Sequence, residues 1–498
     1  MELQFDQTNL ACMARALREV KEQELTQEIR LTDGMPDVGR VLAAWGQPIL
    51  RSKEWRGDQI SVSGGLMTWA LYAPEDGSEP RCVDAWIPFQ FKWDVGDVGR
   101  EGPVRIASLL RFVDGRTVSA RKIMIRAALG CLAEAMYPHQ SAVYAPREVP
   151  EDVQLLRRGY PIRLPREAGE KTFQLEEELA MPGAVPVQEL LSYTLRPEVT
   201  DRRITGDNLA LRGLATLHLV YRCREGRIRT HDFELPFSQL AELEEQYGSD
   251  AGADVMMGVT GLELEPGEDD CLRLKAGLVA QYMIHDRSMV ELTEDAYSPN
   301  RQVEVRKEEL KLPMILEEGH TSVTAKAAFP GMDVQAADVT FWPWFPRQRQ
   351  GPDGIELELT GQFQLLGTNG EGTLQSAVAH WDGQERIPAD EDSRMDLLVM
   401  PTGPAMAVSG PEGMEAKAEL SLRTHTTTDR GLPMVTGLEL GEIREADPNR
   451  PSLILCRADG ERLWDLAKRS GSTVDAIRLA NGLEEELMGN RMLLIPVS

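Results

Sequence analysis

The chain has 498 residues, a formal net charge of −26 at pH 7 and an isoelectric point near 4.8. Its hydrophobic fraction of 42% and charged fraction of 27% are typical of a folded chain with several domains, and they exclude a largely disordered one. Nucleic acids and anionic membranes bind dense positive surfaces, so this acidic composition argues against both as the main partner. Residues 161–448 carry 27 basic and 51 acidic side chains, whereas the last fifty residues carry seven of each.

The N-terminus and the cysteines indicate the compartment. Residues 1–6 lack the basic and apolar regions of an export signal, and no stretch approaches about 18 uninterrupted apolar residues. The six cysteines are spaced singly, without a CxxC pair, which favours reduced thiols. We therefore expect a cytoplasmic protein with no membrane span.

The first predicted element is an amphipathic helix. Within residues 7–23, apolar side chains recur at the three- and four-residue spacing of one helix face, at Leu10, Met13, Leu17 and Val20. Residues 1–30 are therefore expected to form this leading helix and an entry segment.

Beyond the predicted helix, the chain contains an internal repeat. The segment 57–64 (GDQISVSG) resembles the segment 206–213 (GDNLALRG), and 357–361 (LELTG) is a fainter third copy. Several matches in the same order, at offsets close to 148 residues, indicate repeated units. The glycine that ends each copy should hold an equivalent position in its unit, at a bulge or a close approach between strands.

The repeats have the pattern of β-strands. Apolar and polar residues alternate before the shared glycine, as at Ile60 and Val62, and clusters of turn residues separate these stretches. The stretch 118–132 fits a strand or a helix, and its counterparts in the later copies favour a strand. The expected fold class is mainly β, with three tandem sandwich-like or barrel-like units over residues 31–160, 161–318 and 319–447.

The last fifty residues differ from the repeats. Residues 453–455 and 492–496 have the pattern of strands, and 462–470 and 474–480 that of two short helices. Pro448 and Pro451 mark a linker before them. Residues 448–498 are therefore expected to form a small α+β tail of order βααβ.

This tail resembles a LysM domain. The resemblance rests on the opening turn Gly460-Glu461-Arg462-Leu463-Trp464, on Ile477 and Asn481 at the end of the second helix, and on the closing Leu493-Leu494-Ile495-Pro496. In that family the opening turn and the segment after the second helix line a groove for N-acetylglucosamine polymers. The resemblance implies a partner- or glycan-binding surface at Gly460, Arg462, Leu463, Trp464, Asn481, Leu483 and Leu487. Glu461-Arg462 stands where the family has Asp-Thr, a difference that favours a protein ligand.

The front of the chain resembles the SPOCS domain. The matching residues are Met35-Pro36-Asp37-Val38-Gly39, Trp45-Gly46 and the segments 72–77 (YAPEDG) and 86–90 (WIPFQ). The first repeat follows the pattern most closely, the second less and the third least. Such domains occur in tandem before a C-terminal LysM domain in SipL-like spore coat morphogenetic proteins of spore-forming clostridia.

The combined resemblance implies a function in sporulation. It points to a non-enzymatic adaptor in the mother cell, at the forespore surface or in the spore coat, whose LysM-like tail recruits the ATPase of the coat's basement layer. The alternative is a peptidoglycan-binding protein of the cell wall or spore cortex. The absence of an export signal favours the adaptor, because the wall lies outside the membrane.

Catalytic patterns are absent from the sequence. It has no GxxxxGK[ST], GxGxxG, GxSxG or HExxH motif, and its seven histidines lack ligand spacing, so we expect no catalysis, cofactor or metal. A pair of carboxylates for glycoside hydrolysis stays open, because 80 acidic residues offer many pairings. His218 alternates with leucines, which predicts a solvent-facing strand residue.

One aromatic segment, Trp342-Pro343-Trp344-Phe345, has two interpretations. A proline between two tryptophans disfavours a central strand and predicts a loop or a sheet edge. Its rings could pack against the core or form an exposed interaction surface.

Overall fold

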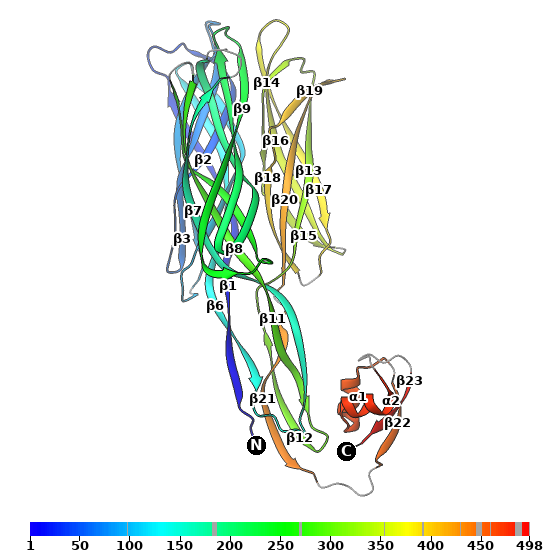
Figure 1. The fold of residues 1–498 in the computed structure, drawn as a ribbon. Helices are drawn as coiled ribbons and strands as arrows, with labels where there is room; N and C mark the ends of the chain where they lie inside the picture. The colour runs from blue at the N-terminus through cyan, green and yellow to red at the C-terminus, as the bar shows by residue number, and fades with distance from the viewer. Residues whose placement is uncertain are drawn as a thin grey trace.

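Three β-sandwiches stand side by side at one end of the molecule, and a narrower stem of long strands leads from them to a small helical module (Figure 1). The computed structural model describes residues 1–96, 98–181, 187–267, 271–352, 354–390, 393–428, 430–444, 451–458, 460–483 and 491–497. The predicted fold class, mainly β with a small α+β tail, is confirmed.

The first sandwich consists of two antiparallel sheets with the strand orders β1-β6-β5 and β2-β3-β4. Alternating apolar side chains of both sheets fill the space between them, and Ile60, Val62, Trp93 and Ile123 are fully buried there. The stretch 118–132 is β-structure, as its counterparts predict. The strands are β1 (Phe5–Arg30), β2 (Val38–Arg56), β3 (Gln59–Pro74), β4 (Arg81–Asp94), β5 (Val104–Ser119) and β6 (Lys122–Pro146).

The predicted leading helix is wrong. Residues 7–23 belong to the strand β1, which pairs with β6 along its whole length. Ala16 is an extra residue in this pairing, because Arg15 lies opposite Met136 and Leu17 opposite Ala135. Such a bulge moves the inward-facing positions from even to odd residue numbers, and the combined spacing imitates a helix.

The second sandwich repeats this arrangement. Its sheets have the orders β10-β11-β7 and β8-β9. The predicted boundary between residues 160 and 161 falls inside a continuous strand, β7. The strands are β7 (Gln154–Ala180), β8 (Val187–Cys223), β9 (Ile228–Tyr247), β10 (Gly252–Pro266) and β11 (Cys271–Tyr297).

The third sandwich has the orders β13-β20-β18, with β19 also on β20, and β14-β16-β15, with β17 also on β16. The predicted boundary between residues 318 and 319 lies inside β13. The strands are β13 (Met314–Pro330), β14 (Gln335–Pro343), β15 (Arg347–Gly351), β16 (Gly354–Thr368), β17 (Leu374–Ile387), β18 (Ser393–Pro401), β19 (Met406–Gly410) and β20 (Gly413–Thr428).

The shared glycines occupy equivalent places in the three sandwiches, as predicted. A Cβ atom on Gly64 would lie 2.1 Å from the carbonyl oxygen of Ile49, and one on Gly213 would lie 2.2 Å from that of Glu198. In both cases the ring of a phenylalanine on the following strand also fills the space. At Gly361 the ring is that of Phe341, which lies on an earlier strand, β14. A close approach of strand and ring therefore requires glycine at this position.

Buried polar groups join the sandwiches. Gln281 of the second sandwich donates from Nε2 to the carbonyl of Ile106 and accepts from its N–H, both at 2.8 Å. Gln364 of the third sandwich makes the same pair of bonds with Ala44. A buried polar group left without a partner costs about 1–3 kcal/mol, so these contacts hold the sandwiches in one relative placement.

The aromatic segment at residues 342–345 packs between sandwiches. Trp342 and Phe345 are buried, and the rings of Trp344 and Phe345 lie against Gly130 of β6. Trp342 and Pro343 end β14, an edge strand of its sheet, as the proline predicts, and the rings of the segment fill an internal interface.

The stem consists of the distal parts of β1, β6, β7 and β11 together with the paired strands β12 (Arg301–Leu310) and β21 (Leu432–Ile443). The N-terminus adds to its edge, since Met1 and Leu440 exchange two backbone hydrogen bonds of 2.7 Å. The module beside the stem contains β22 (Leu453–Ala458), α1 (Leu463–Ser470), α2 (Val474–Asn481) and β23 (Arg491–Pro496).

Candidate functional site

The C-terminal module packs its two helices on one face of the β22–β23 sheet, which confirms the predicted βααβ order. Gly471 and Gly482 end the helices in left-handed conformations, with φ of +66° and +62°, where glycine has no side-chain clash. The buried core of the module consists of Ala458, Leu463, Trp464, Leu466, Ala467, Ile477, Leu493 and Ile495.

Four residues of the predicted binding surface lie at the start of α1. Gly460 adopts a φ of +74° in the turn before the helix. Arg462 is exposed and pairs with Asp465 at 3.0 Å between Nε and Oδ2. Leu463 is buried in the module's own core, and Trp464 is only 7% exposed. Of these side chains, only that of Arg462 is directed to solvent.

The other predicted residues lie around the end of α2. Asn481 donates from Nδ2 to the carbonyls of Ile477 and Leu494, and its Oδ1 accepts from the N–H of Leu494. These hydrogen bonds connect the end of α2 to β23. Leu483 is half-buried against the core that contains Leu463 and Trp464, so the structure brings these predicted segments together. Leu487 and the predicted boundary at Pro448 lie outside the described residues.

The module docks on the stem through Trp464. Its indole Nε1 donates a hydrogen bond of 2.9 Å to Oδ2 of Asp295 on β11, and Lys468 reaches the same oxygen at 2.7 Å. The hydroxyl of Tyr297 donates to the carbonyl of Ser472 at 3.0 Å, and its ring meets that of Trp464 edge-on at 4.8 Å. The side chain predicted to contact a partner is thus covered by the stem.

Asp295 is the electrostatic centre of this docking contact. Burial alone raises the pKa of this carboxyl group, but hydrogen bonds from Lys468, Trp464 and Lys307 outweigh burial and lower the pKa to about 2. The carboxylate is therefore charged at neutral pH and holds two cations, one from the module and one from β12.

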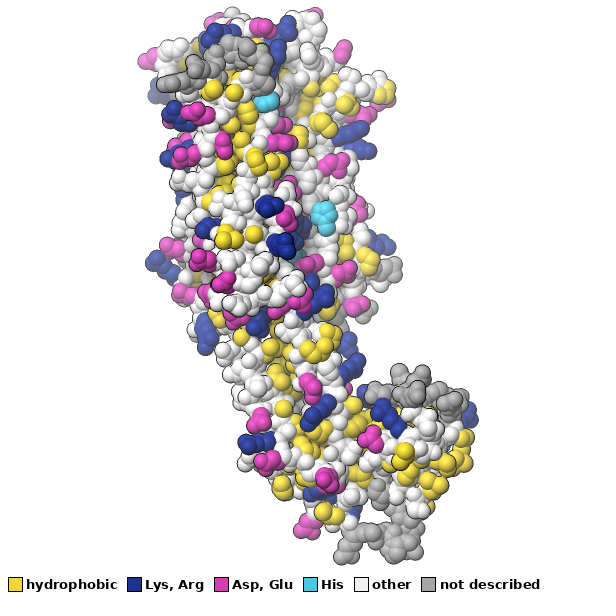
Figure 2. Space-filling view, in the orientation of Figure 1, with side chains coloured by type: hydrophobic (Ala, Val, Ile, Leu, Met, Phe, Trp, Pro, Cys, Tyr) yellow, Lys and Arg dark blue, Asp and Glu magenta, His cyan; other side chains and the backbone are white. Residues whose placement is uncertain are grey.

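The opposite face of the module's sheet is mostly apolar and exposed. On β22 and β23 every second side chain points away from the helices; four of these are exposed hydrophobic side chains, with Leu455 at 61%, and Arg457 lies at one end of the same face, opposite Met492. We call this surface the outer sheet face; it consists of Leu453, Leu455, Met492 and Leu494. Figure 2 shows hydrophobic side chains gathered on the flank of the module. In the sequence, this face could have been predicted from residues 453–455, because a strand that is apolar at every position has hydrophobic side chains on both of its faces.

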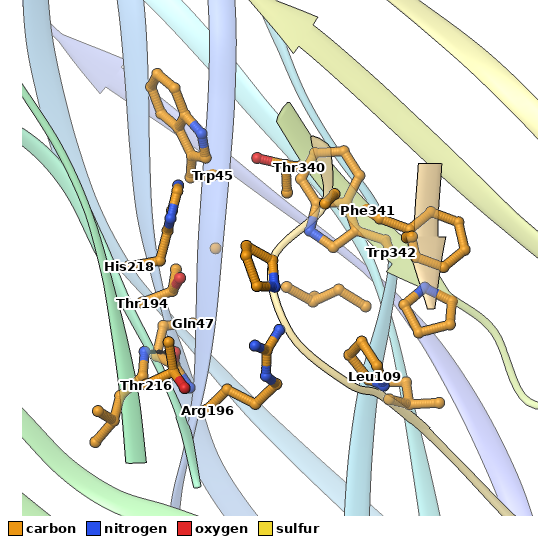
Figure 3. Close-up of a pocket in the computed structure, with 18 of the residues that line it drawn as sticks. Trp45, Gln47, Leu109, Thr194, Arg196, Thr216, His218, Thr340, Phe341 and Trp342 are labelled. Atoms are coloured by element: carbon orange, nitrogen blue, oxygen red, sulfur yellow. Dashed lines mark hydrogen bonds between the residues drawn. The ribbon is translucent and has the colours of Figure 1, made fainter. Parts of the chain in front are cut away.

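A second polar centre lies where the three sandwiches meet (Figure 3). Asp338 of β14 accepts hydrogen bonds from Trp45 Nε1 of the first sandwich, at 2.8 Å, and from His218 Nε2 of the second, at 2.9 Å. Asp232 binds the other ring nitrogen of His218 at 2.6 Å. The prediction of a solvent-facing His218 is therefore wrong, because the third sandwich covers that face of β8.

His218 is positively charged at this junction. Burial alone lowers the pKa of its imidazole, but the hydrogen bonds to Asp232 and Asp338 outweigh burial and raise the pKa to about 10. The same contacts lower the pKa of Asp338, against the effect of its burial. The junction thus contains a charged histidine between two carboxylates.

The described residues offer no metal centre, since no three His, Cys, Asp or Glu side chains among them gather as ligands would. In the part of the chain that the structure describes, neither helix is long and apolar enough to cross a membrane.

Comparison with known proteins identifies one segment. No curated protein and no solved structure matches the chain significantly. The family model described as SipL, SPOCS domain, matches residues 186–265, which span nearly all of β8, β9 and β10. The match falls on the second repeat, whereas the sequence pattern predicted the closest resemblance in the first. Part of the second sandwich, residues 186–265, is thus similar to the SPOCS domain, which supports a sporulation-related role for the chain.

Proposed function

We propose that the protein is a non-enzymatic adaptor in endospore envelope assembly, which binds the ATPase of the coat's basement layer through its C-terminal module. It would act in the mother cell at the forespore surface. The SPOCS match to residues 186–265 supports the sporulation role. The order of elements in the module, together with its resemblance to LysM domains, supports a binding role for the tail.

The three sandwiches, in this proposal, are SPOCS-like units that form a rigid spacer. Their common strand order and the equivalent glycines support a shared origin. Buried contacts such as those of Gln281 and Gln364 restrict movement between the units. A rigid spacer presents the module at a fixed distance from whatever the sandwiches contact.

The observation that carries the proposal is the outer sheet face. Contiguous exposed apolar patches on small units mark protein contacts, because their burial releases water at about 25 cal/mol per Å². A glycan groove at the opening turn would be flanked by the stem, since Trp464 and Lys468 of α1 are engaged by Asp295. The free face of the module therefore favours a protein over a glycan.

A second copy of the chain fits this face less well. Each copy carries a net charge of −26, which opposes the association of two copies. We therefore assign the face to a different protein, the basement-layer ATPase.

The proposal is tested by capture of the purified ATPase on the full-length chain. Leu455→Glu and Leu494→Glu each place a charge in the outer sheet face and should weaken binding by about 30-fold, the equivalent of about 2 kcal/mol. Leu479→Glu is the matched control, because Leu479 is an exposed leucine of α2 that lies outside the face. Equal capture by all three variants and the wild type would contradict the proposal.

A further inference from the structure

A cavity of about 210 Å³ lies at the junction of the three sandwiches, beside the charged His218 (Figure 3). We call it the junction cavity. One wall is polar and comes from β8, with Thr194, Arg196 and Thr216. The facing wall is apolar and consists of Leu109, Phe341, Trp342, Pro343, Pro401 and Pro404.

Arg196 lies between these walls, and its side chain is directed into the cavity (Figure 3). It is mostly buried, yet it donates no hydrogen bond and forms no ion pair with any residue that the structure describes. Burial lowers the pKa of its guanidinium, and the charges of Asp232 and Glu198 only partly offset this effect. None of the Arg196 nitrogens is a fully buried unpaired atom, so the guanidinium is reached from the cavity, and its N–H donors are available to water or to a ligand there.

The neighbouring charges leave Arg196 as the cation available to a ligand. His218 is also positive, but both of its ring nitrogens are engaged by Asp232 and Asp338. Asp232 in turn is bound to His218 at 2.6 Å, which offsets its repulsion of an anion. The hydroxyls of Thr194 and Thr216 make no hydrogen bond to a described residue, so they add two donors beside Arg196.

We propose that the junction cavity binds a small carboxylate with an apolar group, with Arg196 as its principal donor. The planar guanidinium offers two parallel N–H groups that match the two oxygens of a carboxylate. The apolar group would lie against Trp342 and the prolines. A cavity of about 150 Å³ is known to hold benzene, so the junction cavity has room for one aromatic ring with its acid group.

The experiment uses 4-fluorobenzoate as the probe and the full-length chain. Its fluorine NMR signal should broaden with a dissociation constant of about 0.1–1 mM, as expected for ten heavy atoms. Arg196→Met should weaken binding at least tenfold without lowering the melting temperature, because the substitution removes an unpaired charge. Arg111→Met, which removes an exposed cation of β5 outside this cavity, should leave binding unchanged. Neutral 4-fluorobenzamide should bind at least tenfold more weakly than the acid.

A second arm distinguishes a free acid from the end of a peptide chain. A tripeptide that ends in phenylalanine is compared with its C-terminal amide by competition against the probe. Tighter binding of the free-acid tripeptide than of 4-fluorobenzoate assigns the cavity to a chain terminus, and weaker binding assigns it to a free small acid. The proposal is overturned if neither acid binds, or if Arg196→Met lowers the melting temperature and leaves probe binding intact. Both results can be obtained whether or not the chain captures the ATPase, so failure of this proposal is distinguishable from failure of the proposed function.

Discussion

Trp464 in the C-terminal module donates a hydrogen bond of 2.9 Å to Asp295 in the stem, 169 residues earlier in the chain. This contact directs the α1 side of the module toward the stem and leaves the outer sheet face exposed to solvent. The aromatic side chain expected to meet a partner thus has a structural role, and the exposed surface lies on the opposite side of the same module.

Asp295→Ala should release the module from the stem. The substitution removes the acceptor of Trp464 and the partner of Lys468 and Lys307, and hydrogen bonds to a charged group contribute about 1.5–3 kcal/mol each. Small-angle X-ray scattering should show a larger maximum dimension. Asp286→Ala, a change on the same strand away from the module, serves as the control. An unchanged scattering profile for Asp295→Ala would show that other contacts hold the module.

The charged His218 predicts a pH dependence of stability. Its folded-state pKa of about 10 lies above the ordinary value of 6.5, so its contribution is complete below pH 6.5 and is lost as the pH rises toward 10. The difference in unfolding free energy between the wild type and His218→Gln should therefore shrink by about 4 kcal/mol between pH 6 and pH 10. Chemical denaturation at both pH values measures it. A difference that stays constant with pH would show that His218 is neutral at the junction.

The equivalent glycines predict a stability defect that two sandwiches share. Gly64→Ala and Gly213→Ala each place a Cβ within 2.2 Å of a backbone oxygen, so each should lower the unfolding free energy by about 1–3 kcal/mol. Gly34→Ala is the control, because nothing lies within 4 Å of its added Cβ. Denaturant titration compares the three variants. If Gly64→Ala is as stable as Gly34→Ala, the close strand approach is not a requirement of the fold.

The module should fold on its own, because its core is formed mostly by its own side chains. A peptide of residues 447–498 is expected to show helical circular dichroism and a cooperative melt. Leu463→Asp puts a charge into the buried core and should abolish the melt, whereas Leu455→Asp on the exposed face should preserve it. An unstructured wild-type peptide would mean that Tyr297 and its neighbours are needed for folding.

Local patterns in the sequence predicted the repeats, the β-class and the tail. The segments ending at Gly64 and Gly213 share a turn glycine seven residues earlier, and both turn glycines adopt positive φ. The pattern failed in β1, where an extra residue at Ala16 shifts the alternation and imitates a helix. Pairing with β6 determines that this segment is a strand, and no local sequence pattern identifies β6 as its partner.

The contacts of the candidate sites could not be predicted, because they join distant parts of the chain. His218 has the pattern of a polar strand face, and only the third sandwich, 120 residues later, supplies Asp338 to cover it. Arg196 lies within β8, and its sequence neighbours do not predict a cavity. The cavity forms because Trp342 and Pro401 of the third sandwich pack near Arg196. Such neighbours follow from the packing of whole units rather than from spacing.

Binding of a protein by the module, rather than of a glycan, is the central claim. The most direct measurement offers the full-length chain, in parallel, insoluble peptidoglycan and the purified ATPase of the coat's basement layer. The account predicts that the chain captures the ATPase, that Leu455→Glu loses this capture, and that neither protein pellets with peptidoglycan. A chain that pellets with peptidoglycan and captures no ATPase would contradict the account and establish the wall-binding alternative.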